Sequence, residues 1–198
     1  HRVAQIEVAV KVLRSELAAD PDFVRGLERE CALLHQLAHP RIVGFRDLVL
    51  TDGGAAVVLE LLRGQDLHAR IRRGALPPAE VSQHLDAILA GLAHAHAHGV
   101  LHRDIKPANV FLCRRGGIKL LDFGIARAAE GAHATRTGVI AGTYDYMAPE
   151  VFEGKQGAAA DLYAAGLVAW EMLVGRAACP QGVPAAKMGW HLGVGPSD

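Results

Sequence analysis

The stretch His102-Arg103-Asp104-Ile105-Lys106-Pro107-Ala108-Asn109 decides how this chain folds and which chemistry it can perform. Asp122-Phe123-Gly124 follows it at a short distance. Together the two stretches supply an Asp that can orient a hydroxyl, a neighbouring Lys, and an Asn and a second Asp that can hold Mg²⁺. These residue types in this order are what a phosphoryl-transfer site requires.

The composition limits the possible classes of protein. Of the 198 residues 51% are hydrophobic, which suffices for one sizeable core or two small lobes, and the net charge of zero indicates no broad basic surface for nucleic acid. Cys31, Cys113 and Cys179 fit neither a disulfide framework nor a metal-ligand spacing, so a reduced, cytoplasmic setting is expected. No signal peptide is expected from the first residues of the sequence, and the apolar stretch Leu162–Val174 is too short to span a bilayer.

The first third of the chain is predicted to be rich in strands. Glu7–Leu13 is a β-branched run and predicts a strand, while Asp22–Leu37 carries an apolar stripe and predicts a helix. Ile42–Leu50 and Ala55–Leu61 read as two strands, and Asp52-Gly53-Gly54 between them is a hairpin signal.

The pattern becomes helical from Gly64 onward. A long helix is expected from about Leu76 to His98, ended by Gly99. Further elements are expected as two short strands and two helices, at Val110–Leu112, Ile118–Leu121, Ala148–Glu153 and Ala160–Val174. The tail Gly182–Asp198 has weak periodicity, so little order is expected there.

Several motifs occur in a fixed order along the chain. They are Val8-Ala9-Val10-Lys11, Glu30, the stretch at 102–109, Asp122-Phe123-Gly124, Gly142-Thr143 and Ala148-Pro149-Glu150. With this set the chain resembles the protein kinase superfamily, specifically the bacterial Ser/Thr-type kinases, from about Val3 to Arg176. The resemblance implies an α+β bilobal fold, with a small strand-rich N-lobe in residues 1–62 and a larger helical C-lobe in residues 63–198.

The implied activity is transfer of the γ-phosphoryl group of Mg-ATP to Ser and Thr hydroxyls of protein substrates. In the family Asp104 would orient the substrate hydroxyl and Lys106 would offset charge on the transferred group. Thr143 would hydrogen-bond both, and Lys106 with Thr143 indicates Ser/Thr rather than Tyr substrates. Asn109 and Asp122 would bind the magnesium ions.

Lys11 lies within an apolar strand, and the resemblance directs it to the α and β phosphates of ATP. The alternative for an isolated Lys there is an edge-strand side chain that reaches water. Glu30 is expected to be the ion-pair partner of Lys11. Glu28 is the competing candidate, and we expect it to be solvated.

The resemblance also implies an adenine site. Ala9 and Phe111 would sandwich the base, Leu59 would lie at the back of the pocket, and the backbones of Glu60 and Leu62 would hydrogen-bond the adenine. A second set would stack to link the lobes, with plain core packing as the alternative: His102, Phe123, Leu34 and Phe45.

The loop after Asp122 carries a candidate regulatory site. Thr135 and Thr137 are hypothesised autophosphorylation sites, which implies self-association, and a phosphate there would pair with Arg103 and Arg127. Two ordinary loop threonines are the alternative. His94, His96 and His98 permit a metal reading as well, but histidines near a helix C-terminus are favoured by the helix dipole.

Two departures from the family pattern concern the ends of the sequence. The phosphate-covering glycine-rich loop should precede Val3, and the final helices of the large lobe should follow the Asp161 helix. We therefore expect a kinase truncated at both ends, with weak or no turnover by this piece alone. A non-catalytic kinase-like scaffold and a small-molecule phosphotransferase are the competing interpretations. The second does not explain Gly142-Thr143 or Ala148-Pro149-Glu150.

Overall fold

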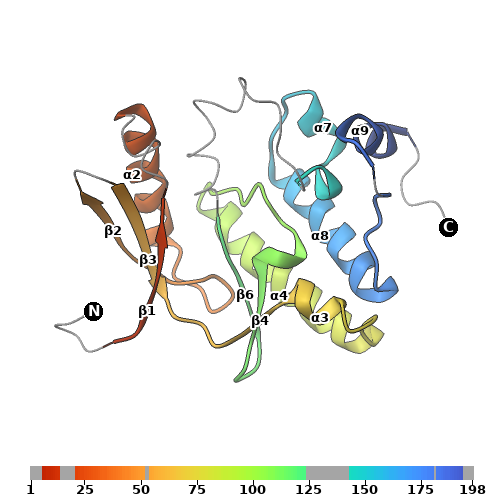
Figure 1. Ribbon diagram of the computed structural model, residues 1–198, viewed down its shortest axis with the longest axis horizontal. Helices are drawn as coiled ribbons and strands as arrows, with labels where there is room; N and C mark the ends of the chain where they lie inside the picture. Colours follow the sequence, from red (N-terminus) through yellow and green to blue (C-terminus); the bar gives the residue numbers. More distant parts are fainter. Residues whose placement is uncertain (1–5, 14–20, 52–53, 124–142, 181, 194–198) are drawn as a thin grey trace.

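The computed structural model describes residues 6–13, 21–51, 54–123, 143–180 and 182–193. A strand-rich part and a helix-rich part lie side by side (Figure 1). The first is built from β1 (Val8–Val12), α2 (Pro21–Gln36), β2 (Phe45–Thr51) and β3 (Gly54–Glu60). The α+β fold expected from the motifs is confirmed.

The first sheet is antiparallel, with the strand order β1-β3-β2. The β2–β3 hairpin ends in the pair Thr51 and Gly54, as the turn signal predicts. Helix α2 packs against β2, and its buried residues recur at helical spacing: Phe23, Leu27, Cys31 and Leu34. The predicted apolar stripe of this helix is therefore confirmed.

The helix-rich part begins with a second small sheet. Its strands β4 (Gly64–Asp66), β5 (Val110–Cys113) and β6 (Ile118–Leu120) are antiparallel. Asp66 caps the short helix α3 (Leu67–Ile71), since its carboxylate accepts a hydrogen bond from the Ala69 N–H at 2.7 Å.

The long helices form the core of this part. Helix α4 (Pro78–Ala97) packs against α8 (Ala158–Val174), and the chain leaves α4 at Gly99 with φ 72°, as the sequence predicts. The 3-10 turns η1 (Pro107–Asn109) and η2 (Thr143–Tyr146) and the short helix α7 (Pro149–Phe152) complete the region around the catalytic motifs. Among the described helices, none is long and apolar enough to cross a membrane.

The expectation of little order in the tail is wrong for residues 184–193, which form helix α9 (Pro184–Gly193). Lys187 forms an ion pair with Asp145 at 2.5 Å. The buried His191 ring lies 2.9 Å from the Tyr163 hydroxyl and 2.7 Å from the Tyr144 carbonyl oxygen. These tertiary contacts stabilise a helix whose weak periodicity gave little local signal.

Backbone contacts join the two parts directly. Ile42 forms a parallel bridge with Leu120, and the Val43 N–H donates to the Leu120 carbonyl at 2.9 Å. The His102 and Phe123 rings lie 4.4 Å apart and both are buried, so the expected contact between them is present. The core is consequently continuous from α2 to α8.

Candidate active site

Asp161 on α8 holds the backbone at the start of the stretch 102–109. Its Oδ2 accepts a hydrogen bond from the His102 N–H and its Oδ1 accepts one from the Arg103 N–H, both at 2.8 Å. His96 Nε2 lies 2.8 Å from Oδ2. Arg103 has φ 65°, a left-handed conformation that a non-glycine residue keeps only where its surroundings fix it. The buried Asp161 supplies that restraint.

The anchoring role of His96 is one that sequence reasoning missed. The three histidines near the C-terminus of the helix indicate a helix-dipole effect, and nothing in their spacing points to an Asp partner. Its partner lies 65 positions away, so only the fold brings the two side chains together.

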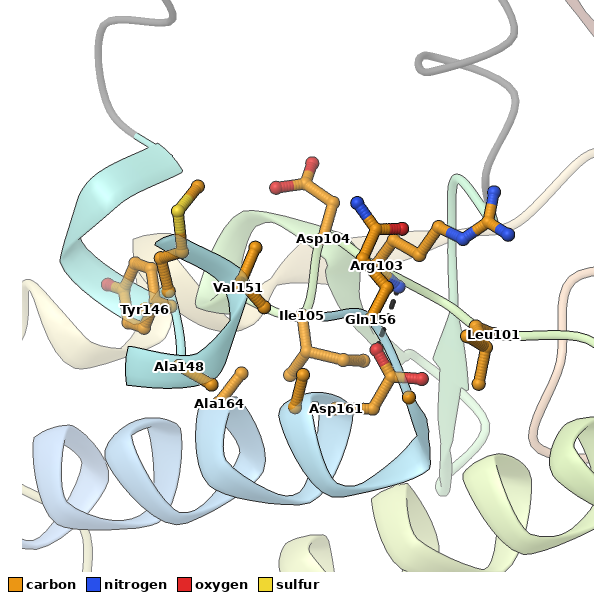
Figure 2. Close-up of a pocket in the computed structure, with 13 residues that line it drawn as sticks. Leu101, Arg103, Asp104, Ile105, Tyr146, Ala148, Val151, Gln156, Asp161 and Ala164 are labelled. Atoms are coloured by element: carbon orange, nitrogen blue, oxygen red, sulfur yellow. Dashed lines mark hydrogen bonds between the residues drawn. The ribbon is translucent and has the colours of Figure 1, made fainter. Parts of the chain in front are cut away.

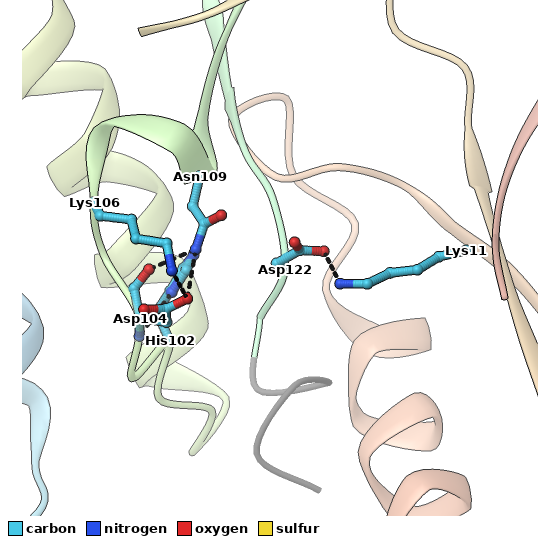
Figure 3. Close-up of polar contacts among 6 residues, drawn as sticks. All are labelled: Lys11, His102, Asp104, Lys106, Asn109 and Asp122. Atoms are coloured by element: carbon cyan, nitrogen blue, oxygen red, sulfur yellow. Dashed lines mark hydrogen bonds and ion pairs between the residues drawn. The ribbon is translucent and has the colours of Figure 1, made fainter. Parts of the chain in front are cut away.

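Two of the expected catalytic residues, Asp104 and Lys106, lie together with the expected magnesium ligand Asn109 at η1 (Figure 3). Asp104 Oδ2 accepts hydrogen bonds from Lys106 Nζ at 2.7 Å and from Asn109 Nδ2 at 2.9 Å. Asn109 Nδ2 also donates to the Asp104 carbonyl at 2.7 Å. The amide nitrogen of Asn109 is thereby occupied, which leaves its side-chain oxygen as the atom that a cation would contact.

Asp122 lies between this group and Lys11 in Figure 3. Lys11 Nζ and Asp122 Oδ1 are 2.8 Å apart, with side-chain exposures of 38% and 32%. Asp122 adopts φ 57°, a left-handed conformation that Asp tolerates better than most residues. The pair joins β1 of the strand-rich part to the segment that follows β6.

The expected pairing of Lys11 with Glu30 is not what the structure shows. In the described part of the chain Lys11 forms its ion pair with Asp122, and Glu30 is half-buried on α2. Burial raises the pKa of Glu30, and the positive charge of Arg103 partly opposes that rise. Asp122 lies within hydrogen-bond distance of the Lys11 ammonium, whereas the positive charge that acts on Glu30 is that of Arg103. Glu28 is exposed, as expected.

The residues expected around adenine come from both parts. Ala9 on β1 lies opposite Leu59 on β3 in the first sheet, and Phe111 lies on β5 of the second. Leu62 follows β3 in the segment that leads to β4. Ala9 and Leu59 therefore lie in the strand-rich part, Phe111 lies in the helix-rich part, and Leu62 lies in the segment that connects them.

Glu60 has a structural role that the sequence did not indicate. Its carboxylate accepts a hydrogen bond from the Gly44 N–H at 2.7 Å and forms an ion pair with Lys119 on β6. Lys119 Nζ also donates to the Ile42 carbonyl at 3.1 Å. The Glu60 side chain therefore ties the last residue of β3 to the second sheet.

Several residues that the sequence predicts for the catalytic or regulatory site lie outside the part of the chain that the structure describes. These are Arg127, Thr135 and Thr137, together with the side chain of Thr143, whose backbone begins η2. Arg103, the remaining regulatory candidate, is described and acts electrostatically on Glu30.

A mainly apolar pocket adjoins Asp104 (Figure 2). Ile105 lies between Asp104 and helix α8, while Met147, which follows η2, and Val151 on α7 also line the pocket. Tyr146 donates a hydrogen bond to Glu171 Oε2 at 2.6 Å, and burial raises the pKa of both side chains. This bond fixes the wall of the pocket opposite the catalytic stretch.

Comparisons with known proteins agree with this geometry. Residues 1–189 match the sequence profile of the protein kinase domain. The chain is 43% identical over 194 residues to serine/threonine-protein kinase PkaA of Streptomyces coelicolor, covering 96% of this chain and 36% of that protein. It is 38% identical to serine/threonine-protein kinase PrkC of Bacillus subtilis, with 86% and 26% covered. The corresponding values for serine/threonine-protein kinase PknA of Mycobacterium tuberculosis are 37%, 85% and 41%. The chain thus spans less than half the length of these relatives.

Proposed function

This chain belongs to the protein kinase family, and we propose that it transfers the γ-phosphoryl group of ATP to Ser and Thr hydroxyls of protein substrates. The observation that carries the proposal is the Asp104 carboxylate, which is hydrogen-bonded by Lys106 and Asn109 and lies beside the pocket of Figure 2. The relatives named serine/threonine-protein kinases support the class of acceptor.

The donor set fits the ions that accompany ATP in this family. Mg²⁺ prefers oxygen ligands, and Asn109 Oδ1 and the Asp122 carboxylate offer them on facing segments (Figure 3). Bound Mg-ATP would supply the phosphoryl group and a neutralised leaving group. Within that reaction Asp104 orients the acceptor hydroxyl and takes its proton, and Lys106 Nζ offsets negative charge beside it.

Lys11 has two possible anionic partners in this proposal, Asp122 and the phosphates of the nucleotide. Its side chain is more than a third exposed, so it can exchange the Asp122 carboxylate for a phosphate at small cost. Ala9, Leu59 and Phe111, with the backbones of Glu60 and Leu62, would bind the adenine. Glu30, desolvated on α2, would become the partner of Lys11 when Asp122 turns to the metal.

Phosphorylation of Thr135 and Thr137 is the proposed regulatory step. A phosphate there would pair with Arg103 and Arg127, and its formation requires one copy of the chain to act on another. Mass spectrometry after incubation with Mg-ATP would detect it. Phosphate found only at other residues would exclude these two sites.

The proposed function is tested by phosphate transfer to a generic protein substrate. Both this chain and the chain with its natural flanking sequence are compared with their Asp104→Asn variants. Loss of the proton acceptor is expected to lower turnover by about a thousandfold, because a positioned general base contributes that much in enzymes. Equal phosphate transfer by the wild type and the Asp104→Asn variant of the longer chain would contradict the kinase proposal.

A further inference from the structure

A second cavity lies between α3, α4 and the β5–β6 hairpin, and it shares no lining residue with the pocket beside Asp104. Its volume is about 710 Å³. Pockets for small molecules usually measure roughly 300 to 1,000 Å³ and are mostly apolar. The volume of this cavity lies within that range, but charged and amide side chains contribute much of its lining, so its chemistry suits a peptide segment with charged side chains better than a mostly apolar small molecule.

Arg41 is held in place at this cavity. Its N–H donates to His39 Nδ1 at 3.2 Å and its carbonyl accepts from the Leu120 N–H at 2.8 Å. Its guanidinium lies against Gly117, where an added Cβ would be only 2.6 Å from Nη1. Within the described ranges of the chain, no carboxylate lies within ion-pair distance of Arg41. A positioned arginine therefore faces the cavity with its charge uncompensated.

A second group of charges lies on the α3–α4 side. Arg70 and His84 share the carboxylate of Glu80, at 3.2 Å and 3.5 Å. The contact of His84 with this carboxylate is not a hydrogen bond, so the buried His84 Nε2 has no hydrogen-bond partner among the described residues. One carboxylate thus balances Arg70, and the cavity as a whole keeps one excess positive charge from Arg41.

The edge of the cavity adds to this excess. The turn that carries Gly116 and Gly117 also carries Arg114 and Arg115, which are both exposed. The whole chain has no net charge, so this face concentrates positive charge that is balanced elsewhere. Attraction of an acidic partner is the expected consequence.

Apolar side chains lie between the charges. Ala87 on α4 and Leu112 and Ile118 on the hairpin line the same cavity. A free inorganic anion would use only the arginines and leave this surface uncovered, whereas a peptide that carries both acidic and apolar side chains would use both. Arginine pairs with carboxylates through two parallel hydrogen bonds, which favours Glu and Asp in such a peptide.

We infer that this cavity binds an acidic peptide segment, with carboxylates on Arg41 and the neighbouring arginines and apolar side chains over Ala87 and Leu112. The binding does not depend on phosphoryl transfer. It is therefore measured without nucleotide, and its outcome is independent of the kinase assay described above.

The test is fluorescence anisotropy of a fluorescein-labelled peptide of repeated Glu-Glu-Leu, with a Lys-Lys-Leu peptide of equal length for comparison. Arg41→Gln removes the uncompensated charge, and Gln83→Glu places a negative charge in the cavity with nearly the same side-chain shape. Each is expected to weaken binding of the acidic peptide by about fivefold, the worth of one partly exposed charge pair. Arg29→Gln, an exposed arginine on α2, is the matched control and should leave binding unchanged.

Three results would overturn the inference. They are equal binding of the acidic and basic peptides, unchanged affinity in Gln83→Glu, and displacement of the peptide by an equal concentration of inorganic phosphate, which would indicate a site for small anions. Gln83→Glu keeps the test decisive if Arg41→Gln unfolds, because residue 83 is exposed on the surface of α4.

Discussion

The two halves of the candidate active site are built in different ways. Asp104, Lys106 and Asn109 contact one another across separations of only two and five positions. Lys11 and Asp122 are 111 positions apart and come from different parts of the molecule. The first half is fixed by one turn and by Asp161 beneath it, whereas the second depends on how the strand-rich part sits on the helix-rich part. Adjustment of the site is therefore expected in the Lys11 half.

Lys11→Met is expected to lower activity strongly and to change stability very little. Loss of the charge that would hold the α and β phosphates of ATP is expected to lower turnover by about a hundredfold or more. The ion pair with Asp122 is 38% and 32% exposed, so the free energy of unfolding should change by less than about 1 kcal/mol. Kinase assays and urea unfolding of the same preparation measure the two effects.

Lys155→Met is the matched control, because Lys155 is an exposed Lys paired with Glu153 within the helix-rich part. Lys155→Met should change neither the kinase turnover nor the free energy of unfolding. If Lys11→Met unfolded the protein as readily as it inactivated it, Lys11 would be a structural residue and the contrast between the halves would disappear.

Asp161→Ala is expected to destabilise the first half. It leaves the buried His102 N–H and the partly buried Arg103 N–H without their acceptor and removes the partner of His96. The free energy of unfolding should fall by about 3 kcal/mol, since each buried group loses its hydrogen bond. Asp86→Ala on α4 removes an exposed Asp instead and serves as the control in denaturant titrations. Similar midpoints for the two variants would show that Asp161 does not support the catalytic stretch.

The same contrast explains what the sequence could predict. The motifs at 102–109 and 122–124, the hairpin at Thr51 and Gly54, and the helix end at Gly99 follow from local rules that act within a few residues. The grouping of Asp104 with Asn109 belongs to this class, because a single 3-10 turn brings them together.

Long-range contacts account for what the sequence missed. The partner of Lys11 depends on the position of α2 relative to β6, and no local pattern encodes that distance. Helix α9 is stabilised by Tyr163, Tyr144 and Asp145 rather than by its own periodicity. The Glu60 carboxylate acts through Lys119, 59 positions away, so its role could not be predicted from its neighbours.

Glu60→Gln tests the link between the two parts and should have a moderate effect. Gln keeps an oxygen for the Gly44 N–H but removes the charge that pairs with Lys119. Both side chains are about four-fifths buried, so a loss of about 1 to 2 kcal/mol in unfolding free energy is expected. Glu153→Gln, an exposed partner of Lys155, is the control in the same thermal and chemical melts. If Glu60→Gln and Glu153→Gln changed the unfolding free energy equally, the backbone bridge between Ile42 and Leu120, and not the Glu60–Lys119 ion pair, would join the two parts.

The smallest expected effect is a pH dependence centred on His39, which stacks on His94 at 4.7 Å between centroids where the two parts meet. Desolvation, and then the positive charges of His94, Arg41 and Lys119, lower the pKa of His39 from its ordinary value of about 6.5. At pH values below that ordinary pKa, His39 binds a proton in the unfolded chain but not in the folded one. The free energy of unfolding therefore falls as the pH falls. His39→Asn, which keeps an acceptor for the Arg41 N–H, should flatten the decline between about pH 7 and pH 5.5 measured by urea unfolding. His35→Asn, a change of an exposed histidine on α2, is the control and should leave the decline unchanged. An identical decline in both variants would assign the pH dependence to another histidine, such as the buried His102.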